Sequence, residues 1–245
     1  MNVRLAGALI LVVLLSGFTG CSTNANDPFD IGSVKTYRDI PGVTNNEIEA
    51  IEALKSTRQS FTFGSLKTTE MFILPNGSKA GFVPMLGDLF SGLFGIPFTH
   101  ELYDWGVLIE EIEEGAIDFT SEMTPTPERR EHFYMTLPIA ERSLGIFTYG
   151  SRDDIETEND VTGLRLGFYE DTVTAQSILN AYPTLTFEQI PVYSIEDAIE
   201  KLGSGVIDAF VDDSVSASEF EYNAYITSRT FFPLVYTPVS FYREP

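Results

Sequence analysis

Three short polar segments of this sequence carry side chains that could bind a small charged molecule. They are residues 124–130 (TPTPERR), residues 170–172 (EDT) and the acid pair Asp212 and Asp213. Arg129 in the first segment offers a planar fork of N–H donors, which matches a carboxylate better than a lysine would. An acid such as Asp213 can accept hydrogen bonds from an ammonium group. A zwitterion such as an amino acid needs both charges, held together in a poorly hydrated cleft.

Each of these residues also has a purely structural interpretation. Arg129 could be a surface arginine beside its acidic neighbours, and Thr124 could cap the turn that follows it. Asp213 could be the N-cap of a helix, with Asp212 as the actual ligand contact. Thr172 falls at an expected strand-to-helix turn, where the N–H groups of a helix start can bind an anion. Residue types alone leave these alternatives open.

Other kinds of chemistry find little support. His100 and His132 lie far apart without the spacing of metal ligands, so we expect no metal and no cofactor. Cys21 is the only cysteine, which excludes a disulfide within the chain and a cysteine-based metal site. The glutamates within residues 110–114 form a solvated helix face rather than a catalytic set. We therefore expect a binding protein and not an enzyme, with no catalytic residue.

Charge and composition narrow the class of partner. The 245 residues include 15 basic and 36 acidic side chains, and the net charge of −21 would repel a phosphate backbone. Nucleic acid is therefore not an expected partner, and solubility explains the acidity. Hydrophobic residues make up 43% of the chain, enough for the core of one large domain or of two small lobes.

The first twenty residues have the layout of a secretory signal. Arg4 precedes an apolar run over residues 5–15, and residues 16–20 are mostly small and polar. The run is shorter than the roughly 20 residues that span a membrane. Cys21 follows directly, and residues 18–21 (FTGC) resemble a bacterial lipobox, although an ordinary signal peptide with an incidental cysteine fits as well. We expect export, lipidation of Cys21 and a flexible tether over residues 21–36.

The rest of the chain alternates between helix and strand patterns in two halves. Thr44 and Glu47 form a capping box that opens a helix to about Leu54. In the first half we expect strands at 61–63, 71–74, 97–102 and 116–120, and helices at 82–94 and 105–114. The helix over 82–94 should face inward with Phe82, Met85, Leu86, Leu89 and Phe90. In the second half we expect strands at 164–169, 186–192 and 206–211, and helices at 174–181 and 195–202.

Such alternation predicts an α/β fold of mostly parallel sheets flanked by helices. The two halves predict two lobes, over residues 37–148 and 149–232, with a return crossover at 233–245. The linking segments should be residues 145–151 and 231–240. The phrase helix-Gly-apolar-Ile-Asp occurs in both halves, at residues 115–118 and 205–208.

Six phrases in order resemble the family 3 extracellular solute-binding proteins. They are residues 76–82 (NGSKAGF), 103–105 (YDW) followed by 115–118 (GAID), 124–130 (TPTPERR), 136–139 (TLPI), 163–167 (GLRLG) and 205–214 (GVIDAFVDDS). The resemblance implies a type II periplasmic-binding-protein-like clamp that serves as a transporter substrate-binding domain. In that family the returning chain adds helices to lobe 1, so we expect the C-terminal part of lobe 1 to be missing, as in a fragment of a longer receptor.

The resemblance also implies residue roles. Arg129 and Thr124 would take a ligand carboxylate, Asp213 the ammonium, and Thr172 a further contact. Phe72 and Phe63 would form an apolar wall, although residues of this type more often belong to the core. Glu70 and Glu122 are further candidates for ligand binding. Two departures from the family, Glu122 in place of a small residue and the acids before Thr172 in place of glycine, favour a cationic or polyamine-like ligand over an acidic amino acid.

The expected function is extracytoplasmic binding of a small amino-acid-like or cationic solute. The protein would lie in the periplasm or on the outer face of the cytoplasmic membrane, held by a lipid anchor. Its partner would be an ABC permease or, because residues 37–44 look like the start of some bacterial sensor domains, a downstream kinase or cyclic-di-GMP module. A dehydratase-like enzyme on the same fold, or a surface lipoprotein without a small ligand, is the alternative.

Overall fold

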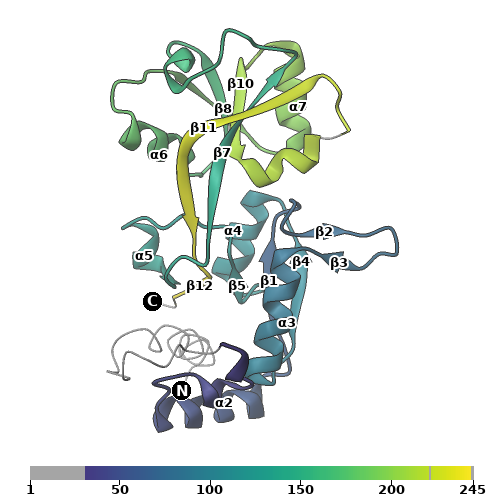
Figure 1. Cartoon of the computed structure of the whole chain (residues 1–245), viewed down its shortest axis with the longest axis vertical. Coiled ribbons are helices and arrows are strands. Elements are labelled where there is room, and N and C mark those ends of the chain that lie inside the picture. The colour runs from purple at the N-terminus through teal and green to yellow at the C-terminus, as the bar shows by residue number, and fades with distance from the viewer. Residues whose placement is uncertain (1–30, 221, 244–245) are drawn as a thin grey trace.

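Two long strands, β7 (Ala140–Tyr149) and β11 (Ile226–Thr237), run side by side through the molecule and join its two lobes (Figure 1). The computed structural model describes residues 31–220 and 222–243. Within this part, none of the helices combines the length and the apolar character needed to cross a bilayer. The expected signal sequence and Cys21 lie outside the described residues.

Lobe 1 is built on a five-stranded sheet with the order β4-β1-β5-β12-β6. Its central strand β1 (Phe61–Ser65) pairs in parallel with β4 (Phe98–Leu102) and β5 (Phe119–Thr120). The returning strand β12 (Ser240–Tyr242) is antiparallel to β5 and to β6 (Phe133–Met135). A short hairpin of β2 (Phe72–Ile73) and β3 (Lys79–Ala80) projects from this lobe (Figure 1).

Two helices cover opposite faces of the lobe 1 sheet. Helix α3 (Phe82–Phe94) packs on the face that carries Phe61 and Phe63. Helix α4 (Trp105–Glu114) packs on the other face, where a Cβ on Gly64 would lie only 2.7 Å from the Leu108 side chain. This glycine therefore lets the helix approach the strand closely. The short helix α5 (Arg129–His132) leads into β6.

The inward face of α3 differs from the prediction. Phe90 is buried as expected, but Phe82, Met85 and Leu89 are exposed, and the helix buries Val83 and Phe94 instead. Nearly every residue of this helix is apolar, so hydrophobic periodicity does not distinguish its faces. In α4, Leu108 and Ile112 are fully buried and Ile109 is partly buried.

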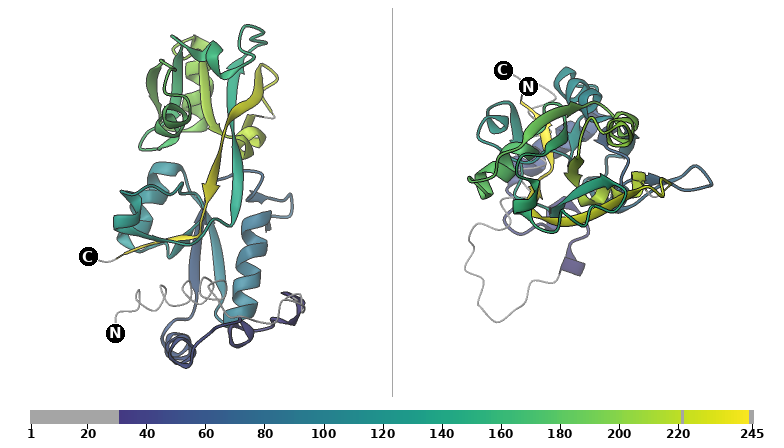
Figure 2. Two further views of the ribbon diagram at one scale, coloured as in Figure 1. Left: turned by 60° about the vertical axis from the view of Figure 1, so that its left-hand side comes forward. Right: turned by 90° about the horizontal axis from the view of Figure 1, so that it is seen from above.

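Residues 31–57 close the end of lobe 1 that is far from lobe 2, as Figure 1 and the left-hand view of Figure 2 show. Helix α2 (Asn45–Thr57) begins with the expected capping box, in which Thr44 and Glu47 satisfy each other's backbone N–H groups. Ile51 and Leu54 of this helix enter the lobe 1 core. The short 3₁₀ helices η1 (Ile31–Ser33) and η2 (Tyr37–Asp39) precede it.

Lobe 2 has a second five-stranded sheet with the order β11-β7-β10-β8-β9. β8 (Arg165–Tyr169) is parallel to β9 (Glu188–Val192) and β10 (Ala209–Asp213), whereas the crossing strands are antiparallel to their neighbours. Helices α6 (Thr174–Ala181) and α7 (Ile195–Ser204) flank the sheet, with 3₁₀ helices at η3 (Glu158–Val161) and η4 (Ser214–Phe220). The predicted two-lobed α/β fold is confirmed, and both sheets are mixed because the chain passes twice between the lobes.

The repeated Gly-apolar-Ile-Asp phrase performs the same task in each lobe. Gly115 and Gly205 end their helices with φ angles of 81° and 70°, values that favour glycine. The aspartate three residues later then accepts a hydrogen bond from the start of the neighbouring strand: Asp118 from the Thr62 N–H at 2.9 Å, and Asp208 from the Arg165 N–H at 2.9 Å. The motif therefore fixes where a helix ends and which strand the chain joins next.

The crossing between the lobes takes place within β7 and β11 themselves. Their pairing shifts register between Thr230 and Leu234 of β11, opposite Gly145 and Ser143 of β7. A register shift of this kind bends a strand pair locally. Residues 145–149 of the expected first linker belong to strand β7 and pair with lobe 2.

Candidate functional site

Direct contacts join the two lobes where they face each other. The Thr69 N–H of lobe 1 donates to the Val215 carbonyl of lobe 2 at 3.2 Å, and Lys67 forms an ion pair with Glu219 at 2.8 Å. Arg129 of lobe 1 donates from Nη2 to the Asp171 carbonyl of lobe 2 at 3.2 Å. The carboxyl ends of the parallel strands of both lobes therefore face each other, which is where open α/β sheets bind ligands.

Two neighbouring cavities lie between the lobes. The larger, of about 190 Å³, is lined by Tyr103 and Trp105 from lobe 1 and by Tyr193 and Glu196 from lobe 2. The smaller, of about 30 Å³, is lined by side chains of both lobes: Leu66, Trp105, Glu122, Thr124, Arg129, Tyr169, Thr172, Val173, Thr174, Asp212 and Asp213. The smaller cavity has room for about one water molecule.

Arg129 sits at the wall of the smaller cavity without a carboxylate partner. Its guanidinium donates from Nη1 to the Thr124 carbonyl at 3.1 Å and lies 5.3 Å from the centre of the Trp105 ring. Among the described residues it forms no ion pair. Burial lowers the pKa of Arg129, because desolvation disfavours its charged form, while Glu128 opposes that shift. The arrangement leaves a desolvated cation that an anionic group would stabilise.

Thr124 and Thr172 line the same cavity from opposite lobes. The Thr172 hydroxyl donates to the Tyr169 carbonyl at 2.8 Å, in the turn between β8 and α6. Asp171 in this turn has a φ of 61°, in the left-handed region that glycine adopts most readily. Its side chain stands where the resemblance implied a glycine, and its carbonyl is nevertheless available to Arg129.

The acid pair at the end of β10 faces this wall. Burial, followed by the neighbouring charge of Asp213, raises the pKa of Asp212 to about 7, while the Ser216 hydroxyl donates to it at 2.6 Å. Burial also raises the pKa of Asp213, although Arg142 opposes the shift. With a pKa of about 7, the Asp212 carboxyl group changes its charge near neutral pH.

Arg142, which the sequence-based prediction missed, is the most extensively paired residue of the interface. It lies on β7 with a side chain that is only 2% exposed, and it contacts acids of both lobes. Its Nη2 and Nε donate to the two carboxylate oxygens of Glu70 at 2.6 and 3.1 Å, and Nη1 donates to Glu122 at 2.9 Å and to Asp213 at 3.0 Å. Its neighbours in sequence, Glu141 and Ser143, gave no signal of this role, because its partners lie 20 to 72 residues away.

Glu70 and Glu122 thus enter the interface as partners of Arg142. Glu122 also accepts hydrogen bonds from the Ser65 hydroxyl and from the Leu66 N–H. The expected apolar wall lies elsewhere: Phe63 is fully buried in the lobe 1 core, and Phe72 is exposed on the β2–β3 hairpin. No cluster of histidine, cysteine or acidic residues within the described part of the chain could hold a metal ion.

Both the sequence and the fold are similar to those of known proteins. The family model "Bacterial extracellular solute-binding proteins, family 3" matches residues 62–178. No curated protein sequence matches the chain. Among solved structures, an ancestral arginine-binding protein bound to arginine is similar, with a TM-score of 0.63, 21% identity and coverage of 76% of this chain and 85% of that one.

Two further structures extend this comparison. The periplasmic domain of BvgS from B. pertussis has a TM-score of 0.66 and 15% identity, over 79% of this chain but only 39% of that one. The ancestral amino acid-binding protein AncCDT-1, a precursor of cyclohexadienyl dehydratase, has a TM-score of 0.60 and 19% identity, over 78% of this chain and 84% of that one. At these identities the similarity establishes the fold.

Proposed function

Because residues 62–178 match the model of family 3 of the bacterial extracellular solute-binding proteins, we propose that this chain binds a small amino-acid-like solute between its two lobes. The observation that carries the proposal is Arg129. Its guanidinium contacts backbone carbonyls of both lobes, has no carboxylate partner in the described structure and lines a cavity. A ligand carboxylate would supply the missing negative charge.

A second unpartnered donor lies beside it. The indole N–H of Trp105 is buried and makes no hydrogen bond within the described structure, and Trp105 lines both cavities. Buried donors without a partner are costly, so a ligand that accepts from this N–H gains affinity. Arg129 and Trp105 together favour an anionic group at this wall.

The opposite wall favours a cationic group. Asp212 and Asp213 border the smaller cavity across from Arg129, and Asp104, Glu196 and Glu219 border the larger one, where Lys67 is the one basic side chain among the lining residues. Tyrosine and tryptophan rings alternate with these acids, and aromatic faces also attract cations. This charge distribution supports a zwitterion or a basic amino acid over an acidic one. The arginine-bound relative is consistent with that choice.

Binding requires the lobes to move. The smaller cavity of about 30 Å³ cannot hold an amino acid, so Arg129 and Asp213 must separate to admit one and then approach again. The register shift between β7 and β11 provides a place for that bending. Contacts to both ends of the ligand form only in the closed state, and this differential affinity drives closure.

We further propose that the protein acts outside the cytoplasm, anchored through Cys21, in uptake or in sensing. The family is extracellular, and the BvgS domain is a periplasmic relative in fold. Its partner would be an ABC permease or a downstream signalling module. A Cys21→Ser variant should leave the membrane fraction, and a variant that stays membrane-bound would reject the anchor.

A second candidate function is catalysis by the same cleft. Asp212 has a pKa of about 7 and borders both cavities, which suits a general acid or base. The structural relative AncCDT-1 is a precursor of a dehydratase. Product formation from a bound solute would support this function, whereas a thermal shift without turnover supports binding alone.

Arg129→Ala tests the binding proposal, with Arg130→Ala as the matched control. Arg130 is the next residue, is exposed, and donates to the Met135 carbonyl rather than facing the cavity. A thermal-shift screen with amino acids, polyamines and organic acids should identify a ligand. Calorimetry should then show that Arg129→Ala weakens binding by about 2–5 kcal/mol, because the ligand carboxylate loses its partner. Equal affinity in the two variants would reject the role of Arg129.

A further inference from the structure

Arg142 forms ion pairs with three acids where the two lobes meet. Its side chain extends from the lobe 1 end of β7, and three carboxylates from three separate segments converge on it. Glu70 follows β1, Glu122 follows β5, and Asp213 ends β10 of lobe 2. Four hydrogen bonds between 2.6 and 3.1 Å involve all three nitrogen atoms of the guanidinium.

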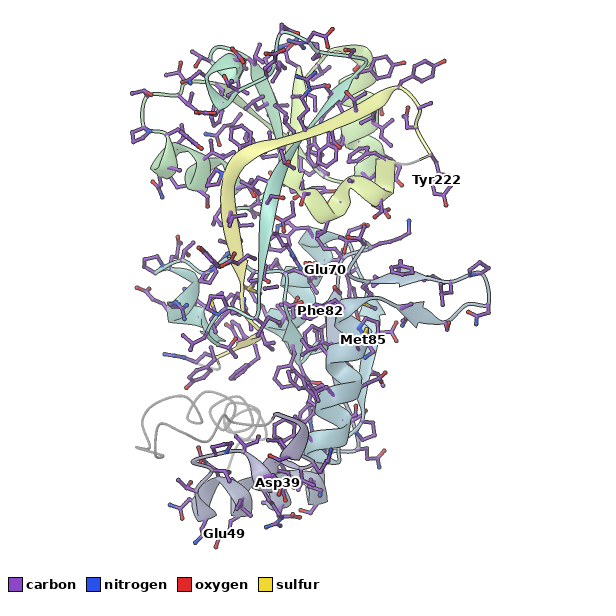
Figure 3. The ribbon with its side chains drawn as sticks, viewed as in Figure 1. Asp39, Glu49, Glu70, Phe82, Met85 and Tyr222 are labelled. Atoms are coloured by element: carbon purple, nitrogen blue, oxygen red, sulfur yellow. The ribbon has the colours of Figure 1, made fainter. Side chains whose placement is uncertain are left out.

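Two of the acids have anchors besides Arg142, Glu122 through its carboxylate and Glu70 through its backbone. Glu122 accepts from Ser65 and from the Leu66 N–H. The carbonyl of Glu70 accepts from the Val83 N–H at 3.0 Å, and a Cβ on Gly81 would lie 2.2 Å from that carbonyl. The close approach allowed by Gly81 thus anchors Glu70 at the start of α3. Figure 3 shows Glu70 at the level where the two lobes meet.

The pairing geometry is that of a recognition site for a guanidinium. The contact with Glu70 is bidentate, and the other amino group bridges two further carboxylates. A bidentate pair of this kind is how proteins bind a free guanidinium group. One guanidinium against three carboxylates also leaves negative charge uncompensated at the interface.

We infer that Arg142 is an internal ligand: it occupies a guanidinium site formed by Glu70, Glu122 and Asp213, and thereby joins the lobes and determines which solutes the cleft accepts. Two of the acids belong to lobe 1 and the third to lobe 2, so the bridge needs no solute. A solute cation must then use Asp212 and the acids of the larger cavity, or displace Arg142. The inference goes beyond the proposed function and does not depend on the identity of its solute.

The direct test is chemical rescue of Arg142→Ala by ethylguanidinium. This probe replaces the atoms that the substitution removes, namely two methylene carbons and the guanidinium. The variant should melt on the order of 10 °C below the parent, because three acids lose their partner. Ethylguanidinium should raise its melting temperature saturably, by roughly 5–10 °C near 100 times the dissociation constant. Ethylammonium at equal ionic strength should do much less.

The parent protein and Arg152→Ala are the controls. Arg152 pairs with Asp154 on the surface of lobe 2, away from the interface. Neither control should respond to ethylguanidinium, because Arg142 already fills the site. An absent response in Arg142→Ala, or an equal response in the parent, would overturn the inference.

Asp213→Asn provides a second test that does not depend on recovering Arg142→Ala. It removes only the lobe 2 arm of the bridge, so small-angle scattering should show a larger radius of gyration than for the parent. Asp153→Asn is the control, because the Asp153 side chain is 86% exposed and pairs with Arg229 within lobe 2. An unchanged radius in Asp213→Asn would show that Arg142 does not hold the lobes together. Neither test uses the natural solute, so a negative result would not affect the proposed role of Arg129. A failure of the Arg129 test would likewise not affect the proposed role of Arg142.

Discussion

Arg129 and Arg142 are both desolvated arginines at the boundary between the lobes, but their surroundings are opposite. Arg142 meets three carboxylates, which raise its pKa against the effect of burial. Arg129 meets two carbonyl oxygens and an aromatic face, and burial lowers its pKa. The first arginine is paired with negative charge from within the chain, whereas the second forms no ion pair among the described residues. The proposed function assigns the negative charge that Arg129 lacks to the ligand.

The largest expected difference between the two arginines is in stability. Arg142→Met should destabilise the protein by about 3–5 kcal/mol, because it leaves acids buried without a cation. Arg129→Met should change stability by no more than about 1 kcal/mol, because the loss of two carbonyl contacts is offset by removal of a desolvated charge. Urea denaturation would measure both changes, provided that the free energy of unfolding depends on urea concentration with the same slope as in the parent. Equal losses in the two variants would contradict the distinction.

A smaller effect concerns pH and the acids that face these arginines. The folded-state pKa of Asp212, about 7, lies above its ordinary value of 3.8, so the folded protein holds this proton more tightly. Protonated Asp212 therefore contributes to the free energy of unfolding at low pH, and this contribution is lost as the pH rises from 3.8 toward about 7. Relative to Asp212→Asn, the parent should lose roughly 2 kcal/mol between pH 5 and pH 8.

Melting temperatures of both proteins across that range would measure the effect. The charged groups around Asp212 are Asp213 and Arg142, and Ser216 donates to it. The Asn variant keeps all three, so the difference between the proteins reports the titration of Asp212 together with its effect on the neighbouring Asp213. Parallel pH profiles would show that this carboxyl group does not titrate in the folded protein in that range.

The sequence predicted Arg129 but not Arg142, for a physical reason. Arg129 stands in a local motif, and Thr124 lies only five residues before it. The partners of Arg142 are 72, 20 and 71 residues away, so only the assembled interface brings them together. The expected residues Thr124, Arg129, Thr172 and Asp213 do line one cavity.

The same reasoning explains which parts of the fold were predictable. The capping box at Thr44 and the two Gly-apolar-Ile-Asp phrases act through neighbours in sequence or through repeated strand contacts. The inward face of α3 depended instead on which of many apolar side chains met the sheet. Phe72 lies on the projecting β2–β3 hairpin and lines neither of the two cavities, which its local sequence did not indicate. Sequence motifs were therefore reliable where a single hydrogen bond within the motif or to a neighbouring strand fixes the local structure.

The smallest expected effect concerns the backbone that holds Arg129. Asp171 offers its carbonyl to this arginine from a left-handed conformation with a φ of 61°. Asp171→Gly and Asp171→Ala both remove the carboxylate, but only glycine adopts this conformation without a steric cost. The Asp171→Gly variant should therefore be more stable than the Asp171→Ala variant by about 1 kcal/mol, measured by urea denaturation. The Asp171→Gly variant should also bind the solute at least as tightly as the parent, because the carbonyl keeps its position.

A pair of double variants tests whether the two arginines are independent. Arg142 is held by side chains and not by this turn. Ethylguanidinium should therefore stabilise Arg142→Ala/Asp171→Gly and Arg142→Ala/Asp171→Ala to the same extent. A different degree of stabilisation in the two double variants would mean that the turn couples Arg129 to Arg142, and that the two arginines do not act independently.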